Sequence, residues 1–412
     1  MKKDIDSLMQ ANNIDALLVM GSGQHNPTMV YLTGGGHLTS ADLIKPLDKK
    51  GILFHGSMER DEAAKSGLET HSYDRYPYLD LKLAARGDPG EIMALRYVHM
   101  FEDAGISSGN VAIYGEVEIG PKFSVLNRVQ ALLPDIKFIG YFNDPIFMTA
   151  MMTKDQEEVD RIHRMGKVTT SVVRRVANFL QFSPVLNETL QSPDKKALTI
   201  GDIRRKINLW LAEEGVENPH GTIFSIGHDA GVPHSQGDDN QPITLGKTIV
   251  FDIYPCEAGG GYYYDFTRTW SLGYASPEVS KAYEQVKTVY DSIVSELTIG
   301  QLFSHYQKRT CEMFENLGHI TVLTNPATME GYVHSLGHGV GLRLHEMPFS
   351  GATATPIEKL VPGCVFTIEP GLYYPSRNFG IRIEDTYQVT TEGTFEKLAD
   401  YPYDLVLPIK HA

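Results

Sequence analysis

Residues 246–252, GKTIVFD, and residues 363–369, GCVFTIE, decide the fold of this chain, because they share one design. Each runs from a glycine through an apolar, strand-like segment to a carboxylate, with a spacing of six residues in both. A second carboxylate follows 13 residues after the first copy, at Asp265, and 15 residues after the second copy, at Glu384. Strands often end in an acid, so coincidence is one explanation. The same order of parts in both copies favours an internal duplication.

Two related strand pairs that face each other would bring Asp252, Asp265, Glu369 and Glu384 together. Four carboxylates cannot crowd together while ionised unless cations neutralise them; otherwise some must stay protonated. Divalent metal ions are the natural partner, and an oxygen-rich set with one imidazole suits Mn, Co, Zn or Fe. Two such ions held close together can share one hydroxide and polarise a scissile carbonyl.

The imidazole is supplied by a further motif, residues 334–346, which read HSLGHGVGLRLHE. Glycines on both sides of His338 let the backbone approach closely and turn sharply. A lone histidine is more often structural than a ligand, but the glycine frame and the carboxylate pairs favour His338 as a ligand. His345 lies seven residues on and can return to the same cavity as a hydrogen-bonding group.

Length and charge limit the class of protein. A chain of 412 residues is long for one core, so we expect two domains. The formal net charge is -14, and there is no dense stripe of Lys and Arg, which argues against a nucleic-acid partner. Neither observation argues against a small peptide substrate.

Cysteine usage and hydropathy predict the compartment. The three cysteines are far apart and form no CxxC pair, so we expect neither a disulfide framework nor a cysteine metal site. The first residues, MKKDIDSLMQ, lack an apolar signal core, and no apolar run reaches the length of a membrane span. We therefore expect a cytoplasmic protein with no membrane partner.

The first part of the chain alternates strand-like and helical patterns, which is a βα rhythm. The expected strands are residues 14–20, 51–55, 111–114 and 135–141. The expected helices are residues 58–65 and 123–133. Asn143-Asp144-Pro145 breaks the pattern. We therefore expect an α/β domain over residues 1–150 and a second domain over residues 151–412.

The second domain begins with helical patterns and ends with strand patterns, which predicts an α+β domain. Apolar residues recur at three-to-four spacing from 154 to 181, as in a long amphipathic helix. A surface excursion over 183–197 and a helix over 200–214 follow. Ser276-Pro277 predicts the capped start of another helix. Strand patterns dominate from residue 320 onward.

These motifs together resemble the pita-bread metallopeptidases, which include methionine aminopeptidase, prolidase, Xaa-Pro aminopeptidase and creatinase. The resemblance is carried by FDIYPCEAGGGYYYDFTRTW (251–270), HSLGHGVGLRLHE (334–346), FTIEPGLYY (366–374) and GIRIEDTYQVT (380–390). IDALLV (14–19), YLTGG (31–35) and MTKDQEEVDRI (152–162) are similar to the branch that contains prolidase, Xaa-Pro aminopeptidase and creatinase. The resemblance is strong from residue 220 to 392 and diffuse before 150.

The resemblance implies the fold, the reaction and the cofactors. The N-terminal domain would be creatinase/prolidase-like, and the C-terminal domain would be a pita-bread catalytic domain. The enzyme would be a metallopeptidase of the Xaa-Pro dipeptidase or aminopeptidase P type, which uses a metal-bridging hydroxide. Two divalent ions per subunit are implied, with manganese as the first expectation and Co, Zn or Fe as alternatives. A homodimer is also implied.

The resemblance assigns the metal ligands residue by residue. Asp252 would chelate one ion, and Asp265 and Glu384 would bridge both ions. His338 and Glu369 would bind the second ion.

Further roles are implied for residues around these ligands. Glu369 would also take the proton of the nucleophilic water. His234, in GVPHS, and His345 would hold the substrate and stabilise the tetrahedral oxyanion. Arg382 would orient Glu384 or a neighbouring carboxylate.

The hairpin between Asp252 and Asp265 departs from the family pattern. It is longer by two residues and contains the run Gly259-Gly260-Gly261, which affects the expected substrate more than the expected catalysis. Dipeptidase and aminopeptidase activities both stay open. So does a creatinase-like hydrolase or lyase that is not a peptidase. A catalytically silent binding module is disfavoured because all five ligand positions are intact.

Other polar residues have plainer interpretations. His220 and His228 read as loop residues, and residues 262–264 (YYY) read as strand residues that alternate between core and cavity. Arg343 could meet a substrate carboxylate, although a solvated charge is an equally good interpretation.

Overall fold

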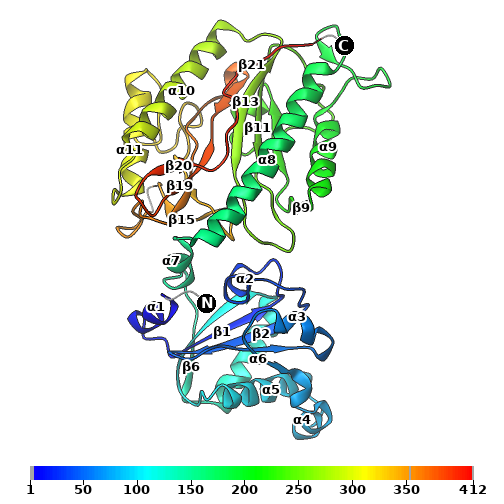
Figure 1. Cartoon of the computed structure of the whole chain (residues 1–412), viewed down its shortest axis with the longest axis vertical. Coiled ribbons are helices and arrows are strands. Elements are labelled where there is room, and N and C mark those ends of the chain that lie inside the picture. Colours follow the sequence, from blue (N-terminus) through cyan, green and yellow to red (C-terminus); the bar gives the residue numbers. More distant parts are fainter. Residues whose placement is uncertain (1–3, 352–353, 411–412) are drawn as a thin grey trace. The chain divides into compact units, whose positions relative to one another are not determined.

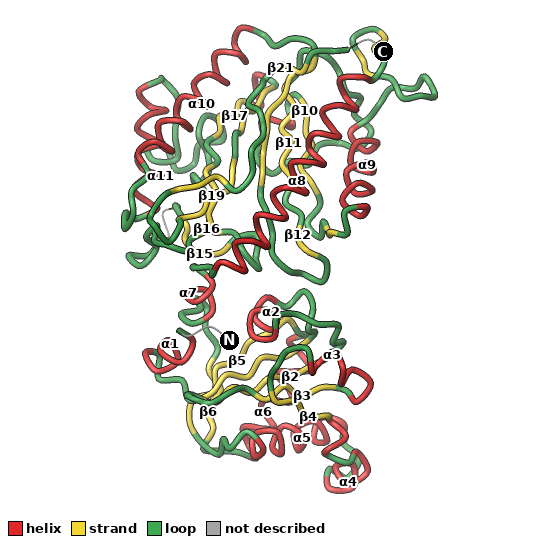
Figure 2. Tube along the Cα trace, viewed as in Figure 1, coloured by secondary structure: helices red, strands yellow, loops and turns green. Residues whose placement is uncertain are grey.

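The computed structural model describes residues 4–351 and 354–410. The chain forms two compact units (Figures 1 and 2). The first unit comprises Met1–Ala150 with Gly259–Gly261, and the second comprises Met151–Ala258 with Tyr262–Ala412. The short helix α7 (Phe147–Met151) contains the division between them. Among the described residues, no helix combines the length and the apolar character that crossing a membrane requires.

The first unit is built on a six-stranded sheet with the order β4-β3-β2-β1-β5-β6. Its strands are β1 (Ala16–Gly21), β2 (Ala41–Pro46), β3 (Ile52–His55), β4 (Glu69–Ser72), β5 (Gly109–Glu116) and β6 (Ile136–Ile139). Its helices are α1 (Ile5–Ala11), α2 (Pro27–Thr33), α3 (Arg60–Ala64), α4 (Tyr78–Ala84), α5 (Pro89–Asp103) and α6 (Ile119–Leu132). Strand β1 is buried along nearly its whole length, as the continuous apolar run in the sequence predicts. The expected α/β architecture is confirmed.

Four longer helices belong to the second unit: α8 (Gln156–Phe182), α9 (Ile200–Glu213), α10 (Pro277–Glu296) and α11 (Phe303–Asn316). Capping residues define three of the starts. Asp155 and Thr199 each form a capping box with the residue three positions on, and Ser276 accepts a hydrogen bond from Val279 N. The predicted helices over 154–181 and 200–214, and the capped start at Ser276, are therefore confirmed.

The strands of the second unit form two larger sheets and several pairs. One sheet has the order β10-β11-β13-β21, from β10 (Thr222–Ile226), β11 (Thr248–Ile253), β13 (Phe266–Leu272) and β21 (Val406–Leu407). The other has the order β15-β14-β16-β19-β20, from β14 (His338–Gly339), β15 (Glu346–Phe349), β16 (Val365–Ile368), β19 (Asp385–Val389) and β20 (Phe395–Lys397). The two-stranded pairs are β17 (Gly371–Tyr374) with β18 (Phe379–Arg382), β9 (Val216–Glu217) with β12 (Cys256–Glu257), and β7 (Val185–Leu186) with β8 (Thr189–Leu190).

The two related sequence stretches occupy matching positions in these sheets. β11 pairs antiparallel with β13, and β16 pairs antiparallel with β19. An antiparallel bridge between Thr267 and Glu384 joins the two pairs. α8 packs on α9 and contacts β13, whereas α10 packs on α11 and contacts β17 and β18 (Figure 1). The facing strand pairs expected from the duplication are therefore present.

Candidate metal centre

Each carboxylate of the repeated motif lies at a strand end or within a strand. Asp252 is in β11, and Asp265 directly precedes β13. Glu369 directly follows β16, and Glu384 directly precedes β19. Because the two strand pairs meet at the Thr267–Glu384 bridge, all four carboxylates reach one cavity of about 660 Å³.

The same cavity is lined by the other residues that the sequence singled out. They are His338, His234, His345, Arg382 and Arg343. His338 begins β14, which pairs with β16, and its backbone N–H donates to Thr367 Oγ1 at 3.1 Å. The chain therefore gathers in one place residues that are more than 130 positions apart in sequence.

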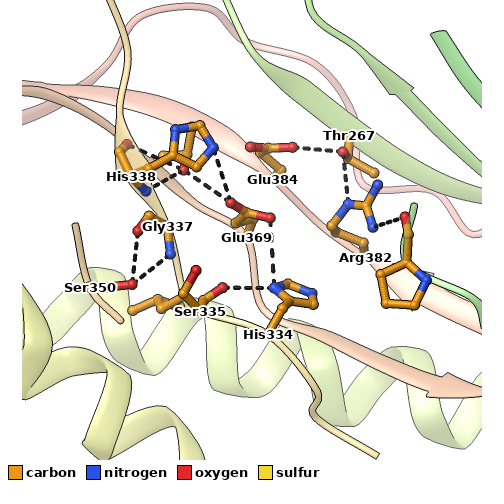
Figure 3. A network of polar contacts seen from close by, with 12 residues as sticks. Thr267, His334, Ser335, Gly337, His338, Ser350, Glu369, Arg382 and Glu384 are labelled. Atoms are coloured by element: carbon orange, nitrogen blue, oxygen red, sulfur yellow. Dashed lines mark hydrogen bonds and ion pairs between the residues drawn. The ribbon is translucent and has the colours of Figure 1, made fainter. Parts of the chain in front are cut away.

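The donor atoms of three buried residues form a compact group. One ligand atom each of Asp265, His338 and Glu384 lies within 4.8 Å of the other two. His338 Nε2 is 3.6 Å from Asp265 Oδ2. It is also 3.4 Å from Glu369 Oε1 (Figure 3). Oxygen atoms with one imidazole nitrogen at this spacing are a suitable donor set for a divalent cation.

Several buried oxygens of this group have no hydrogen-bond partner among the described residues: Asp252 Oδ1, Asp265 Oδ1 and Glu384 Oε1. An unpaired buried carboxylate oxygen is costly, because it has lost water without gaining another donor. Three such atoms facing one cavity fit a site that is completed by a cation.

Burial and mutual repulsion control the charges of these carboxyl groups. Burial, together with the charges of Asp252 and Glu369, raises the pKa of Asp265 well above its ordinary value. Burial and the Asp265 and Glu369 charges do the same to the pKa of Glu384. Burial raises the pKa of Glu369 to about 8, with a further contribution from Asp252. Only added positive charge would let the group ionise fully at neutral pH.

His338 presents a lone pair to the carboxylates. Burial, helped by the nearby His345, lowers the pKa of His338 to about 3, so the ring is neutral. Its Nδ1 lies 3.1 Å from Gly339 O, and a carbonyl can only accept, so the proton is on Nδ1. The lone pair is therefore on Nε2, the nitrogen that faces Asp265 and Glu369. This is the arrangement of a histidine ligand whose second nitrogen is held by a backbone carbonyl.

Arg382 links the carboxylates of both strand pairs and is almost completely buried. Its Nη2 donates to Asp252 Oδ2 at 2.6 Å, and its Nε donates to Thr267 Oγ1 at 3.2 Å. Thr267 Oγ1 in turn donates to Glu384 Oε2 at 2.7 Å (Figure 3). Arg382 therefore contacts Asp252 directly and is connected to Glu384 through Thr267. The resemblance implied that Arg382 orients Glu384 or a neighbouring carboxylate.

His234 and His345 are exposed side chains at the cavity, as a contact with substrate requires. The ring of His345 lies 4.3 Å from that of His338, centroid to centroid. Both histidines can donate hydrogen bonds, and they border the carboxylate group without belonging to its closest cluster.

The structure adds residues that the sequence left without a role. His334 Nδ1 donates to Ser335 O at 2.7 Å, so its Nε2 accepts from the Tyr373 hydroxyl at 2.8 Å. That hydroxyl accepts from Arg382 Nη1 at 2.7 Å, and His334 Nδ1 is 3.9 Å from Glu369 Oε2. Both residues belong to quoted motifs, but only the fold shows that they connect Arg382 with Glu369.

His220 differs from its sequence interpretation as a plain loop residue. It lies in a loop, but it also lines the cavity. Its ring stacks on Tyr263 at 5.7 Å, and the two side chains share a hydrogen bond of 3.2 Å. No local sequence signal distinguishes His220 from His228, because the difference arises from tertiary packing.

Comparisons with known proteins agree with this architecture. The model of metallopeptidase family M24 matches residues 160–391, more than half of the chain. The chain is similar to the Xaa-Pro dipeptidase of Pyrococcus horikoshii, with 29% identity over 396 residues that cover 95% of each protein. It is also similar to the probable dipeptidase PepE of Mycobacterium tuberculosis, with 29% identity over 256 residues. That match covers 62% of this chain and 60% of the mycobacterial protein, less than two thirds of its length.

Solved structures share the whole fold. A dipeptidase from Pyrococcus horikoshii matches with a TM-score of 0.76 and 22% identity, over 98% of this chain and 99% of that chain. The prolidase from Pyrococcus furiosus matches with a TM-score of 0.73 and 22% identity, over 96% of this chain and 99% of that chain. The expected fold, an α/β N-terminal domain followed by a pita-bread domain, is confirmed.

Proposed function

The chain belongs to metallopeptidase family M24, and on this premise we propose that it cleaves the bond between an N-terminal residue and proline in short peptides, with two divalent ions. The observation that carries the proposal is that Asp252, Asp265 and Glu384, which line one cavity, each keep a buried oxygen without a hydrogen-bond partner in the described part of the chain. The name of the Pyrococcus horikoshii relative, Xaa-Pro dipeptidase, supports the choice of substrate.

The donor set suggests how the ions would be held. Asp252 would chelate one ion, His338 and Glu369 the other, and Asp265 and Glu384 would bridge them. Manganese is the first choice, with Co, Zn or Fe as alternatives, because the set is rich in oxygen and has a single imidazole. Bound divalent ions supply Lewis acidity toward the scissile carbonyl and lower the pKa of water.

The side chains around the ions carry out the proton transfers. Glu369, which lines the cavity, takes a proton from the attacking water and returns it to the leaving proline nitrogen. His234 and His345 donate hydrogen bonds to the substrate and to the developing oxyanion. Arg382 holds Asp252 in place through the 2.6 Å contact.

Proline requires a particular kind of subsite. It lacks a backbone N–H and has a fixed φ, so its recognition depends on a shaped apolar wall more than on a backbone acceptor. Four apolar side chains line the cavity beside the polar group: Ile223, Pro233, Leu344 and Phe349. They supply such a wall.

A hydrolysis panel tests the proposal. Metal-depleted protein and Mn-reloaded protein are each given Xaa-Pro dipeptides, Xaa-Pro tripeptides, Xaa-Ala dipeptides and creatine. Metal-dependent cleavage of Xaa-Pro peptides, at least about tenfold faster than that of Xaa-Ala, supports the proposal. The tripeptides separate aminopeptidase from dipeptidase activity. Equal rates, or turnover of creatine alone, would favour the non-peptidase alternative on the same scaffold.

Two further expectations accompany this function. We propose that the enzyme is a homodimer, which light scattering at micromolar concentration would test. The cytoplasmic location expected from the sequence stays a prediction, to be tested by fractionation of the source cells.

A further inference from the structure

A buried ion pair lies outside the carboxylate group, next in sequence to His345 of the cavity. The ammonium of Lys154 contacts Glu346 Oε1, and the two side chains are 2% and 0% exposed. A charge at such a depth is tolerated only when it is paired, because removal from water costs more than an isolated charge can recover. This pair has no part in the proposed ligand set, although Glu346 directly follows His345.

Glu346 holds the loop that leads to His345. The loop joins β14 to β15, and Glu346 Oε2 accepts the backbone N–H of Arg343 at 3.3 Å. A Cβ placed on Gly341 would lie 2.2 Å from Glu346 Oε1, so the loop backbone wraps directly around the carboxylate. The loop side chains Arg343, Leu344 and His345 all line the cavity.

Lys154 connects the ion pair to the start of α8 and to the segment before β16. It lies just before α8, and its backbone N–H donates to Gly363 O at 2.8 Å, where the chain enters β16. In Figure 1 the first turn of α8 lies beside β15, as this contact requires. The ion pair therefore connects the start of α8, the entry to the strand that carries Glu369, and the loop that carries His345.

A backbone contact restrains the same loop at another point. Tyr263 N donates to Gly341 O at 2.8 Å, and Val340 N donates to Val365 O at 3.0 Å. These bonds hold the start of the loop, whereas the segment from Arg343 to His345 is held by Glu346 and by a bond from Gly341 N to Arg343 O at 3.1 Å. Loss of the ion pair would leave that segment without its buried support.

We propose that Lys154 and Glu346 are positioning residues that place His345 and Arg343 over the carboxylate group. They touch neither substrate nor ions and act through the loop that they anchor. The effect on turnover rests on the proposed function of the cavity, but the effect on the position of His345 does not.

The test compares a double variant with a matched control. Removing one partner of a buried pair leaves an unpaired charge, so Lys154→Met or Glu346→Gln alone could lose the fold. Replacing both partners with apolar residues, as in Lys154→Met/Glu346→Leu, removes that hazard. The control is Lys45→Met, because Lys45 is equally buried and pairs with Asp6 at 2.5 Å in the first unit. Each protein is loaded with Mn, and its kcat, KM, metal content and Tm are measured.

We expect the double variant to keep its metal content and to lose at least about tenfold in kcat, with a smaller change in KM. Lys45→Met would lower Tm without a comparable loss of kcat. A purely structural role would affect Tm alone. A double variant that is folded and metal-loaded, with kcat within about twofold of wild type, would overturn the proposal.

A second readout does not depend on any substrate. The imidazole NMR signal of His345, identified by its loss in His345→Ala, is followed in metal-depleted protein. We expect it to shift in the double variant and to stay in place in Lys45→Met. If wild type cleaves no Xaa-Pro peptide, the proposed function fails. The His345 signal still tests whether Lys154 and Glu346 position His345. An unchanged signal would refute the positioning, whatever the activity.

Discussion

At the scale of single residues, the carboxylates of the cavity show an unfavourable arrangement that function explains. Asp265 and Glu384 are both buried, and each keeps one oxygen without a hydrogen-bond partner among the described residues. Burial and like charge raise both pKa values. A structural role would be served better by uncharged side chains. The arrangement is reasonable if cations complete it.

Asp265→Asn is expected to abolish activity and leave the fold intact. An amide retains the size of the side chain but cannot supply two anionic oxygens to bridge two ions. It also removes one of the repelling charges, so the metal-free variant should melt no lower than metal-free wild type. Measurement of kcat/KM and Tm checks both statements. A loss of no more than about tenfold, or 1.4 kcal/mol of barrier, would exclude Asp265 as a bridging ligand.

His345→Ala is expected to reduce turnover far more than metal content. The side chain is exposed at the cavity and lies outside the tightest donor group. Donors aimed at a developing oxyanion typically contribute about 2.7–4 kcal/mol, so kcat should fall by about 10²–10³. Metal analysis of the same preparation is the control. Parallel loss of metal and activity would move His345 into the ligand set.

The sequence could point to individual site residues only where a local pattern marked them. The repeated glycine–strand–carboxylate pattern marks Asp252 and Glu369, and the glycine frame marks His338. His220 and Tyr373 carry no such mark, because their place at the site depends on contacts with Tyr263 and Arg382. Tertiary contacts of this kind leave no local periodicity to detect.

At the scale of elements, the hairpin between Asp252 and Asp265 is fastened to α8. Glu257 in β12 accepts hydrogen bonds from Arg161 Nε at 3.0 Å and Nη2 at 2.5 Å, and it also contacts Arg164. The Arg161 guanidinium stacks 4.6 Å over the Tyr262 ring. These contacts give the long hairpin a fixed conformation, which supports the strand that follows Asp265.

Glu257→Gln is expected to lower the free energy of unfolding at pH 7 by about 1.5–3 kcal/mol, the range for hydrogen bonds to charged groups. Although burial raises it, the pKa of Glu257 is held below its ordinary value of 4.5 by the Arg161 hydrogen bonds. The contribution of its charge is therefore complete above about pH 4.5 and is lost as the pH falls through the folded-state pKa.

Urea unfolding of the metal-free proteins at pH 7 and at pH 3.5 measures this difference. The difference in the free energy of unfolding between wild type and Glu257→Gln should be smaller at pH 3.5 than at pH 7. Glu213→Gln is the control, because its pairing with Arg175 is exposed and should contribute no more than about 1 kcal/mol. A larger free-energy difference at pH 3.5 would contradict the lowered pKa of Glu257.

Apolar spacing predicted the helix over 154–181, and a capping residue, Ser276, predicted the start of α10. α8, α9 and α10 all begin at a capping side chain that the sequence displays. α11 was not predicted; it begins at Phe303, and its N-cap residue, Leu302, makes no side-chain cap. Its buried residues do recur at helical spacing, but without a start signal that pattern is weak. The strand β2 was likewise missed, since it depends on pairing with β1 and β3.

At the scale of the whole molecule, the catalytic unit consists of two similar strand pairs that meet at the Thr267–Glu384 bridge. Each pair contributes two carboxylates, so neither pair alone can assemble the site. Ions bound at the junction would connect the two pairs and relieve their repulsion. Metal binding should therefore stabilise the fold as well as enable the reaction.

Metal stoichiometry tests this account most directly. The protein is stripped with a chelator, reloaded with Mn or Co, freed of excess ion, and analysed by native mass spectrometry beside Asp265→Asn. We predict two ions per chain for wild type and a clear loss for the variant, because the four carboxylates need that much compensating charge and His338 adds a neutral ligand. A stoichiometry near zero under every loading condition would contradict the two-metal site.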